Sequence, residues 1–259
     1  MKISPNFSEV KNIAAAGKYN ILPISCEILS DFTTPIETMK ILKNVSTHCY
    51  MLESAYTDDK WGRYTFLGFN PKLEITCING EMKIGNFKIK TNCPSNYLRQ
   101  ILTDYKSPNF DYLPPFTGGL VGYFSYDYLK YSESTVKCNA QNLENFKDID
   151  LMLFDEVIVF DNIKQKIILI VNMSLNDLET EYNKAVIKLN RLIDLLCNGK
   201  KKNELGGKLL GKVTPLFNKE QFCNMVKKAK YHIHEGDIFQ IVLSNQLSAP
   251  FEGSLLNTY

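Results

Sequence analysis

The sequence is compatible with an α+β protein, because strand hairpins alternate with a few long helices. The strongest hairpin signal is Asn79-Gly80, which lies in a stretch, Leu73–Lys90, that has the pattern of a three-stranded meander. The clearest helix is Leu175–Cys197, where apolar residues keep three- and four-residue spacing until Gly199 ends the pattern. Such a mixture of hairpins and helices is typical of the α+β class.

The remaining elements of this first part of the chain follow from the same two periodicities. Helices are predicted from Pro35, with Thr34 or Thr33 as the cap, and over Asn96–Tyr105. Further strands are predicted at Ile21–Glu27, Cys49–Ser54, Trp61–Phe69 and Leu120–Tyr126, and Leu151–Asp161 and Lys166–Asn172 are predicted to form a hairpin.

The stretch Tyr231–Ser248 combines the end of a helix with a predicted strand. The helical pattern starts after Asn218, a good N-cap, and reaches Gly236, a residue that tolerates the positive φ of a helix end. The β-branched and aromatic run Ile238–Leu243 then predicts a strand buried on both faces. Gln240 lies in the middle of this run.

A glutamine in such a run has two interpretations. A buried amide must satisfy its hydrogen-bonding groups, so Gln240 is either a satisfied structural residue or a polar group that faces a binding site. Periodicity alone favours the structural role.

Composition excludes several classes of protein. The chain has 259 residues, 44% of them hydrophobic, and 30 Lys and Arg residues against 28 Asp and Glu. This balance gives no electrostatic reason to expect binding to nucleic acid or to an anionic membrane, and no apolar run is long enough to cross one. Seven widely spread cysteines without a Cys-x-x-Cys pair argue against a disulfide framework and favour a reducing, cytoplasmic setting.

Three polar residues flank one turn between the strands that contain Cys49 and Phe69. Glu53, Ser54 and Arg63 together offer a carboxylate, a hydroxyl and a guanidinium, which is a set that can hold the two charged ends of an amino acid. The alternative is an ion pair at the surface beside a turn, which contributes little. From the chemistry alone, the surface ion pair is the better interpretation.

The segment GDIFQIVLS at residues 236–244 resembles the first signature of the chorismate-utilising enzymes, in the form found in large subunits of anthranilate synthase. Relatives that add water to chorismate have a lysine general base at the position that matches Gln240. A glutamine is similar to the relatives that use ammonia, which needs no base to activate it. The resemblance therefore implies that Gln240 is a polar group of the substrate pocket.

Two further segments resemble the same family. Leu52-Glu53-Ser54, followed by Gly62-Arg63-Tyr64, is similar to the part of the family that forms the tryptophan feedback site. The resemblance implies that Leu52, Glu53 and Ser54 contribute to this site, and Arg63 is added on the basis of its charge. The segment PPFTGGLVGYFSYD at residues 114–127 is also similar, and we assign it a structural role.

The resemblance implies a fold, an activity and partners. The fold is α+β, with two stacked antiparallel sheets flanked by helices. The activity is the conversion of chorismate and ammonia to anthranilate and pyruvate, with ammonia supplied by a glutamine amidotransferase subunit and with tryptophan as the inhibitor. The Mg²⁺ that the family uses would be bound by residues beyond Tyr259, and no metal ligands are expected in this segment.

The resemblance also implies a division of the chain and an incomplete C-terminal domain. Residues 1–199 would form the N-terminal regulatory domain, 200–214 a linker, and 215–259 the start of a truncated chorismate-binding domain. Two alternatives stay open. One is aminodeoxychorismate synthase component I, which shares the glutamine and the ammonia chemistry, and the other is a non-catalytic tryptophan-binding module.

Overall fold

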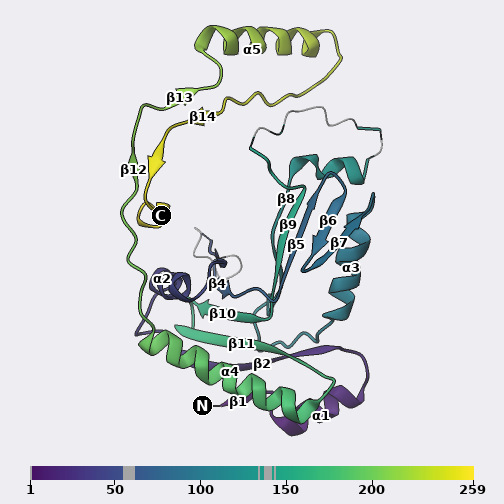
Figure 1. Cartoon of the computed structure of the whole chain (residues 1–259), viewed down its shortest axis with the longest axis vertical. Helices are drawn as coiled ribbons and strands as arrows, with labels where there is room; N and C mark the ends of the chain where they lie inside the picture. Colours follow the sequence, from purple (N-terminus) through teal and green to yellow (C-terminus); the bar gives the residue numbers. More distant parts are fainter. Residues whose placement is uncertain (1, 55–61, 134, 137–141, 143) are drawn as a thin grey trace. The chain divides into compact units, whose positions relative to one another are not determined.

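A computed structural model describes residues 2–54, 62–133, 135–136, 142 and 144–259 (Figure 1). The chain separates into two compact units, Met1–Lys202 and Asn203–Tyr259. Among the described residues, the first unit contains a six-stranded and a five-stranded sheet in which every pair of neighbouring strands is antiparallel. The predicted α+β class with antiparallel sheets is therefore confirmed.

The six-stranded sheet has helices on one of its faces. Its strand order is β1 (Ile3–Ser4), β2 (Ile21–Leu29), β11 (Lys166–Ser174), β10 (Glu156–Asp161), β4 (Tyr64–Phe69) and β3 (Cys49–Leu52). Helix α4 (Leu178–Asn198) packs on β2 and β11, and helix α2 (Pro35–Val45) packs on β3 and β4. Helix α1 (Phe7–Ala15) contacts α4.

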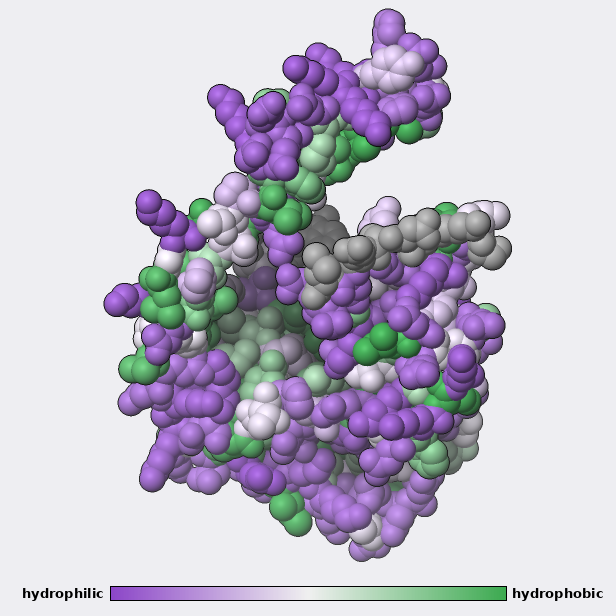
Figure 2. Space-filling model, turned by 45° about the horizontal axis from the view of Figure 1, so that its top comes forward, coloured by the Kyte–Doolittle hydropathy of each residue, from purple (hydrophilic) through white to green (hydrophobic). Residues whose placement is uncertain are grey.

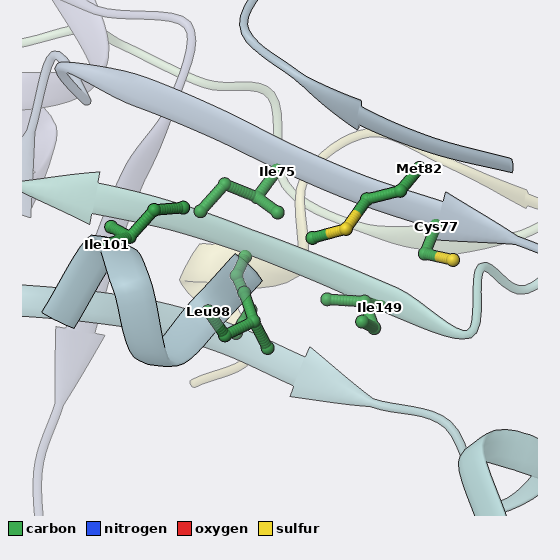
Figure 3. Close-up of a cluster of buried hydrophobic side chains, with 7 residues drawn as sticks. Ile75, Cys77, Met82, Leu98, Ile101 and Ile149 are labelled. Atoms are coloured by element: carbon green, nitrogen blue, oxygen red, sulfur yellow. The ribbon is translucent and has the colours of Figure 1, made fainter. Parts of the chain in front are cut away.

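The five-stranded sheet has its own buried cluster. Its strand order is β7 (Phe87–Lys90), β6 (Glu81–Ile84), β5 (Leu73–Ile78), β9 (Ile149–Phe154) and β8 (Gly119–Phe124). Figure 3 shows Leu98 and Ile101 of helix α3 (Pro94–Asp104) beside Ile75 and Ile149 of the sheet. The 3₁₀ helix η1 (Tyr126–Tyr131) adds two tyrosines to the same cluster.

Local sequence signals account for several element ends. The Thr34 side chain accepts a hydrogen bond from the backbone N–H of Glu37, and Pro35 occupies the first turn of α2, as predicted. Asn79 and Gly80 both have positive φ, 49° and 82°, which is the backbone that a tight hairpin turn requires. These residue choices fix the starting point of α2 and the turn between β5 and β6.

The predicted strand Leu151–Asp161 is wrong, because the structure has two strands there. β9 pairs with β5 and β8, whereas β10 pairs with β4 and β11, so the two strands belong to different sheets. Asp155 lies between them, and its backbone carbonyl accepts a hydrogen bond from the backbone N–H of Asn172. The predicted hairpin with Lys166–Asn172 is confirmed for the β10 half only.

The second unit contains helix α5 (Lys219–His234) and two pairs of short strands. β12 (Lys208–Leu209) pairs with β15 (Phe251–Glu252), and β13 (Thr214–Pro215) pairs with β14 (Leu247–Ser248); the 3₁₀ helix η2 (Leu255–Asn257) follows. Asn218 and Gln221 form a reciprocal capping box at the start of α5. Gly236 follows the helix with φ of 79°, as expected.

The predicted strand Ile238–Leu243 does not form in this structure. These residues have no regular secondary structure and pair with no strand among the described residues. Phe239 is 99% exposed and Val242 is 82% exposed. Strand propensity reflects packing against neighbours, so an apolar β-branched run without a neighbouring strand has nothing to stabilise it.

The helices and the surface agree with the balanced composition. None of the helices described combines the length and the apolar character needed to cross a membrane. Hydrophilic residues cover most of the face visible in Figure 2, and hydrophobic residues occupy separate patches between them.

Candidate functional site

Leu52, Glu53 and Ser54 lie where the edge strand β3 ends. Leu52 is the last residue of β3 and lies opposite Phe66 of β4, and Glu53 and Ser54 follow it directly. The predicted strand extends two residues too far, because Cys49–Ser54 includes these two. Residues 55–61, which include the predicted strand start at Trp61 and most of the predicted turn before it, lie outside the described residues.

The strand register brings Ser54 to the same end of the sheet as Arg63 and Asp161. Tyr64 lies opposite Asp161, and two residues further along β4, Phe66 lies opposite Leu52. Because β3 and β4 are antiparallel, the chain after Leu52 continues toward the end of the sheet at which β4 begins. Glu53 and Ser54, which follow β3, and Arg63, which precedes β4, therefore lie at the same end of the sheet, as predicted from the sequence.

Arg63 forms a bidentate ion pair with Asp161. Its Nε and Nη2 atoms donate hydrogen bonds to Asp161 Oδ1 and Oδ2, at 3.1 and 2.7 Å. The guanidinium also lies over the ring of Tyr64, 4.7 Å from the ring centroid. This geometry differs from the surface pair expected from the sequence, since the carboxylate partner is only 2% exposed.

The electrostatics of Asp161 reflect two opposing effects. Burial raises the pKa of this carboxyl, but the hydrogen bonds donated by Arg63 and by the backbone N–H groups of Lys164 and Ile163 outweigh it. The net result is a pKa below the ordinary value for aspartate, so the carboxylate is ionised at neutral pH.

Aromatic rings cover the sheet face beside Leu52. Directly opposite residues of neighbouring strands point to the same face, so Leu52 shares its face with Phe66. The Phe66 ring centroid lies 5.9 Å from that of Tyr64 and 5.7 Å from that of Phe116. Leu52 itself is 48% exposed. An exposed aliphatic side chain beside aromatic rings, with a serine at the strand end, suits a ligand with a flat apolar group and a polar group.

Sequence reasoning missed the part that Asp161 and Asn162 play at this end of the sheet. The backbone N–H of Asn162 donates to the carbonyl of Arg63 at 2.9 Å, and its side-chain amide donates to the carbonyl of Gly62 at 3.3 Å. The sequence signal was limited to an Asp-Asn turn between two strands. The contact with Arg63 spans 98 residues of sequence, and no local pattern reports it.

Gln240 is exposed in the second unit, within the irregular stretch that follows α5. The expected burial of this amide in a strand is wrong for this structure, for the same reason that the strand does not form. Its assignment to a substrate pocket stays a prediction.

A cavity of about 640 Å³ lies in the first unit, and its lining includes Phe116, the ring that contacts Phe66. Its lining comes from α3, from β8 with the preceding Phe116 and Gly118, from β9 and from Tyr128. Gly118, Gly119 and Gly122, which the sequence assigned a structural role, all have φ above 130°. An added Cβ at Gly118 would lie 2.5 Å from Asn172 Nδ2, so this glycine allows a close approach.

Metal ligands are the remaining question for the site. Within the described ranges, no group of three or more His, Cys, Asp or Glu side chains is arranged to hold a metal ion. No chemical step is assigned to a metal in this segment.

Comparison with known proteins gives a consistent result. Residues 47–259 match the model of a family described as chorismate binding enzyme. The chain is 34% identical to "Anthranilate synthase component 1" of Acetivibrio thermocellus, in an alignment that covers 98% of this chain and 53% of the relative. It is 33% identical to the protein of the same name from Aquifex aeolicus, over 100% of this chain and 53% of the relative.

A solved structure is similar as well. The crystal structure of anthranilate synthase component I from Streptococcus pneumoniae TIGR4 matches with a TM-score of 0.60 and 26% identity, over 86% of this chain and 48% of that chain. The chain thus spans about half the length of the curated relatives that it matches.

Proposed function

The chain belongs to the family of chorismate-binding enzymes, and we propose that it is part of the large subunit of an anthranilate synthase. The complete protein would convert chorismate and ammonia to anthranilate, pyruvate and water. The observation that carries this proposal is the match of 98% to 100% of the chain to curated anthranilate synthase components. The proposal applies to the complete protein, because the relatives are about twice as long.

Gln240 supports the choice of ammonia over water as the nucleophile. An amide cannot remove a proton from water at neutral pH, whereas ammonia attacks without a general base. In the complete protein we place Gln240 in a strand whose neighbours come from the second half of the polypeptide. The exposed apolar side chains of Phe239 and Val242 support this placement, because such side chains are normally covered.

The end of the six-stranded sheet supports feedback inhibition by tryptophan. Leu52 and the rings of Tyr64 and Phe66 offer an apolar face, and Ser54 offers a hydroxyl at the end of the strand. We propose that tryptophan binds at this end of the sheet, with Leu52, Glu53, Ser54 and Arg63 contributing to the site. We call this the tryptophan site below.

The partners and the organisation of the protein complete the proposal. A glutamine amidotransferase subunit would supply the ammonia, and Mg²⁺ would be held by residues beyond Tyr259. Residues 1–199 would form the regulatory domain, 200–214 a linker, and 215–259 the start of the chorismate-binding domain. The widely spread cysteines support a cytoplasmic setting.

Product identification tests this function. The complete protein, encoded by the whole gene, is incubated with chorismate, ammonium and Mg²⁺, and the products are separated by chromatography. Anthranilate and pyruvate in equal amounts would support the proposal. Aminodeoxychorismate without pyruvate would instead support the aminodeoxychorismate synthase alternative. Binding of tryptophan without turnover of chorismate would support the non-catalytic module.

A further inference from the structure

The turn between β10 and β11 holds Arg63, the residue directly before β4, in place. The Asp161 carboxylate accepts four hydrogen bonds, two from Arg63 and two from the backbone N–H groups of Ile163 and Lys164, at 2.7 to 3.2 Å. The two backbone hydrogen bonds thus fix the Asp161 carboxylate independently of the guanidinium. A carboxylate fixed in this way holds a bidentate partner in one orientation.

The same turn also holds the two peptide groups that flank the Cα atom of Arg63. Asn162 donates to the carbonyls of Gly62 and Arg63, and its side-chain amide also donates to Thr65 Oγ1 at 3.4 Å. Side chain and backbone of Arg63 are therefore both held by residues about one hundred positions further along the chain.

Arg63 and Ser54 bound one connection between neighbouring strands. β3 ends at Leu52 and β4 starts at Tyr64, so the connection begins beside Ser54 and finishes at Arg63. Its first end is held by the pairing of β3 with β4, and its second end is held by Asp161 and Asn162.

We propose that Asp161 is a positioning residue of the tryptophan site, acting through Arg63. The inference rests on the proposed function, in which Ser54 belongs to that site. Asp161 neutralises the guanidinium of Arg63 and holds it over the Tyr64 ring. The aromatic side chains beside Leu52 then keep a fixed position relative to Ser54, which follows the end of β3. Loss of the charge at residue 161 would release Arg63 and loosen the site without touching tryptophan directly.

The test uses the complete protein and compares Asp161→Asn with a matched control. Asp161→Asn keeps the size of the side chain and removes its charge. Asp148→Asn is the control, since Asp148 is also buried, forms an ion pair with Lys130 and accepts two further hydrogen bonds, but directly precedes β9 of the five-stranded sheet. The readout is the tryptophan concentration that halves each variant's own uninhibited rate, which a general loss of stability would not raise selectively.

We expect Asp161→Asn to raise this concentration at least tenfold and Asp148→Asn to change it less than twofold. Asp161→Glu, which keeps the charge, should restore part of the sensitivity. Should Asp161→Asn not fold, Asn162→Ala removes the side-chain contacts to Gly62 and Thr65 and should raise the concentration at least threefold.

A Ser54→Ala variant separates the two levels of the proposal. If Ser54→Ala relieves inhibition but Asp161→Asn shifts it less than twofold, the role of Asp161 is wrong and the tryptophan site stands. If Ser54→Ala leaves inhibition unchanged, the tryptophan site is wrong and the role of Asp161 falls with it. An equal rise in Asp148→Asn and Asp161→Asn would also overturn the role, because any buried carboxylate would then act alike.

Discussion

The hydroxyl of Tyr131 donates a hydrogen bond to Asp148 Oδ2 at 2.7 Å and links helix η1 to the start of β9. The Tyr131 hydroxyl oxygen also accepts a hydrogen bond from the backbone N–H of Gly80 at 2.6 Å, in the turn between β5 and β6. Lys130 adds an ion pair to Asp148 at 2.8 Å. Helix η1, the turn between β5 and β6 and the start of β9 thus meet at one polar cluster beside the core of the five-stranded sheet.

Tyr131→Phe should lower the free energy of unfolding by about 2 kcal/mol, because it removes two hydrogen bonds and leaves the backbone N–H of Gly80 without this partner. Asp148 keeps its hydrogen bonds from Lys130 and from the backbone of Asn79. Urea unfolding of the 259-residue chain measures this change. Tyr126→Phe is the control, since Tyr126 is in the same helix and is 89% exposed. Equal effects of the two substitutions would contradict the account.

The two buried aspartates predict an acid-sensitive fold. Burial raises the pKa of Asp148, but hydrogen bonds from Lys130, Tyr131 and the backbone of Asn79 outweigh it and lower the pKa. The pKa of Asp161 is lowered in the same way by Arg63 and its own turn. Both carboxyls therefore bind protons more readily in the unfolded chain, so their contribution to stability is complete above roughly pH 5 and is lost as the pH falls below about 4.

Unfolding free energies measured between pH 7 and pH 3 test this dependence. Asp148→Asn should be less stable than the unsubstituted chain at pH 7 and should lose less stability on acidification. A variant curve that stays parallel to that of the unsubstituted chain would rule out the contribution of Asp148.

Gly68→Ala should destabilise the six-stranded sheet by roughly 1–3 kcal/mol. Gly68 lies opposite Tyr50, and an added Cβ would overlap the tyrosine ring, at 2.7 Å from its Cζ. The ring has little room to move, because its centroid is 4.7 Å from that of Phe154. Gly206→Ala, where the nearest atom would be 3.8 Å away, is the control.

A double-mutant cycle isolates this contact. Tyr50→Leu removes the ring that the new methyl group would meet, so Gly68→Ala should cost less in a Tyr50→Leu background than in the unsubstituted chain. An undiminished cost would mean that the Tyr50 ring is not the cause.

The exposed apolar run at 238–243 predicts self-association of the 259-residue chain. Phe239 and Val242 are both more than 80% exposed, and apolar β-branched segments without a partner strand associate with one another. Replacing both with serine should lower the weight-average molar mass measured by sedimentation equilibrium. Leu205→Ser, at an equally exposed leucine outside the run, should change it less, and a larger effect of Leu205→Ser would refute the assignment.

Local signals in the sequence were sufficient for several element ends. Thr34 and Pro35 start α2, Asn218 starts α5, and Asn79-Gly80 forms the β5–β6 turn, each by contacts within a few residues. The family resemblance could also be recognised from the short segment 236–244, and the family match agrees with it.

Contacts between distant residues were beyond such signals. Residues 151–161 are apolar on both sides of Asp155-Glu156, but the change of sheet at Asp155 depends on partners elsewhere in the chain. Arg63 was expected beside Glu53 and Ser54 because the turn brought them together, but its charge meets Asp161, which only the strand register places there. The run at 238–243 has strand propensity, but none of the described strands pairs with it, and no strand forms there.

The initial rate of anthranilate formation by the complete protein, followed by fluorescence at increasing ammonium concentration with and without tryptophan, tests the proposed function most directly. We predict a rate that rises with ammonium, requires chorismate and falls when tryptophan is added. Consumption of chorismate that is independent of ammonium, or that yields no anthranilate, would contradict it.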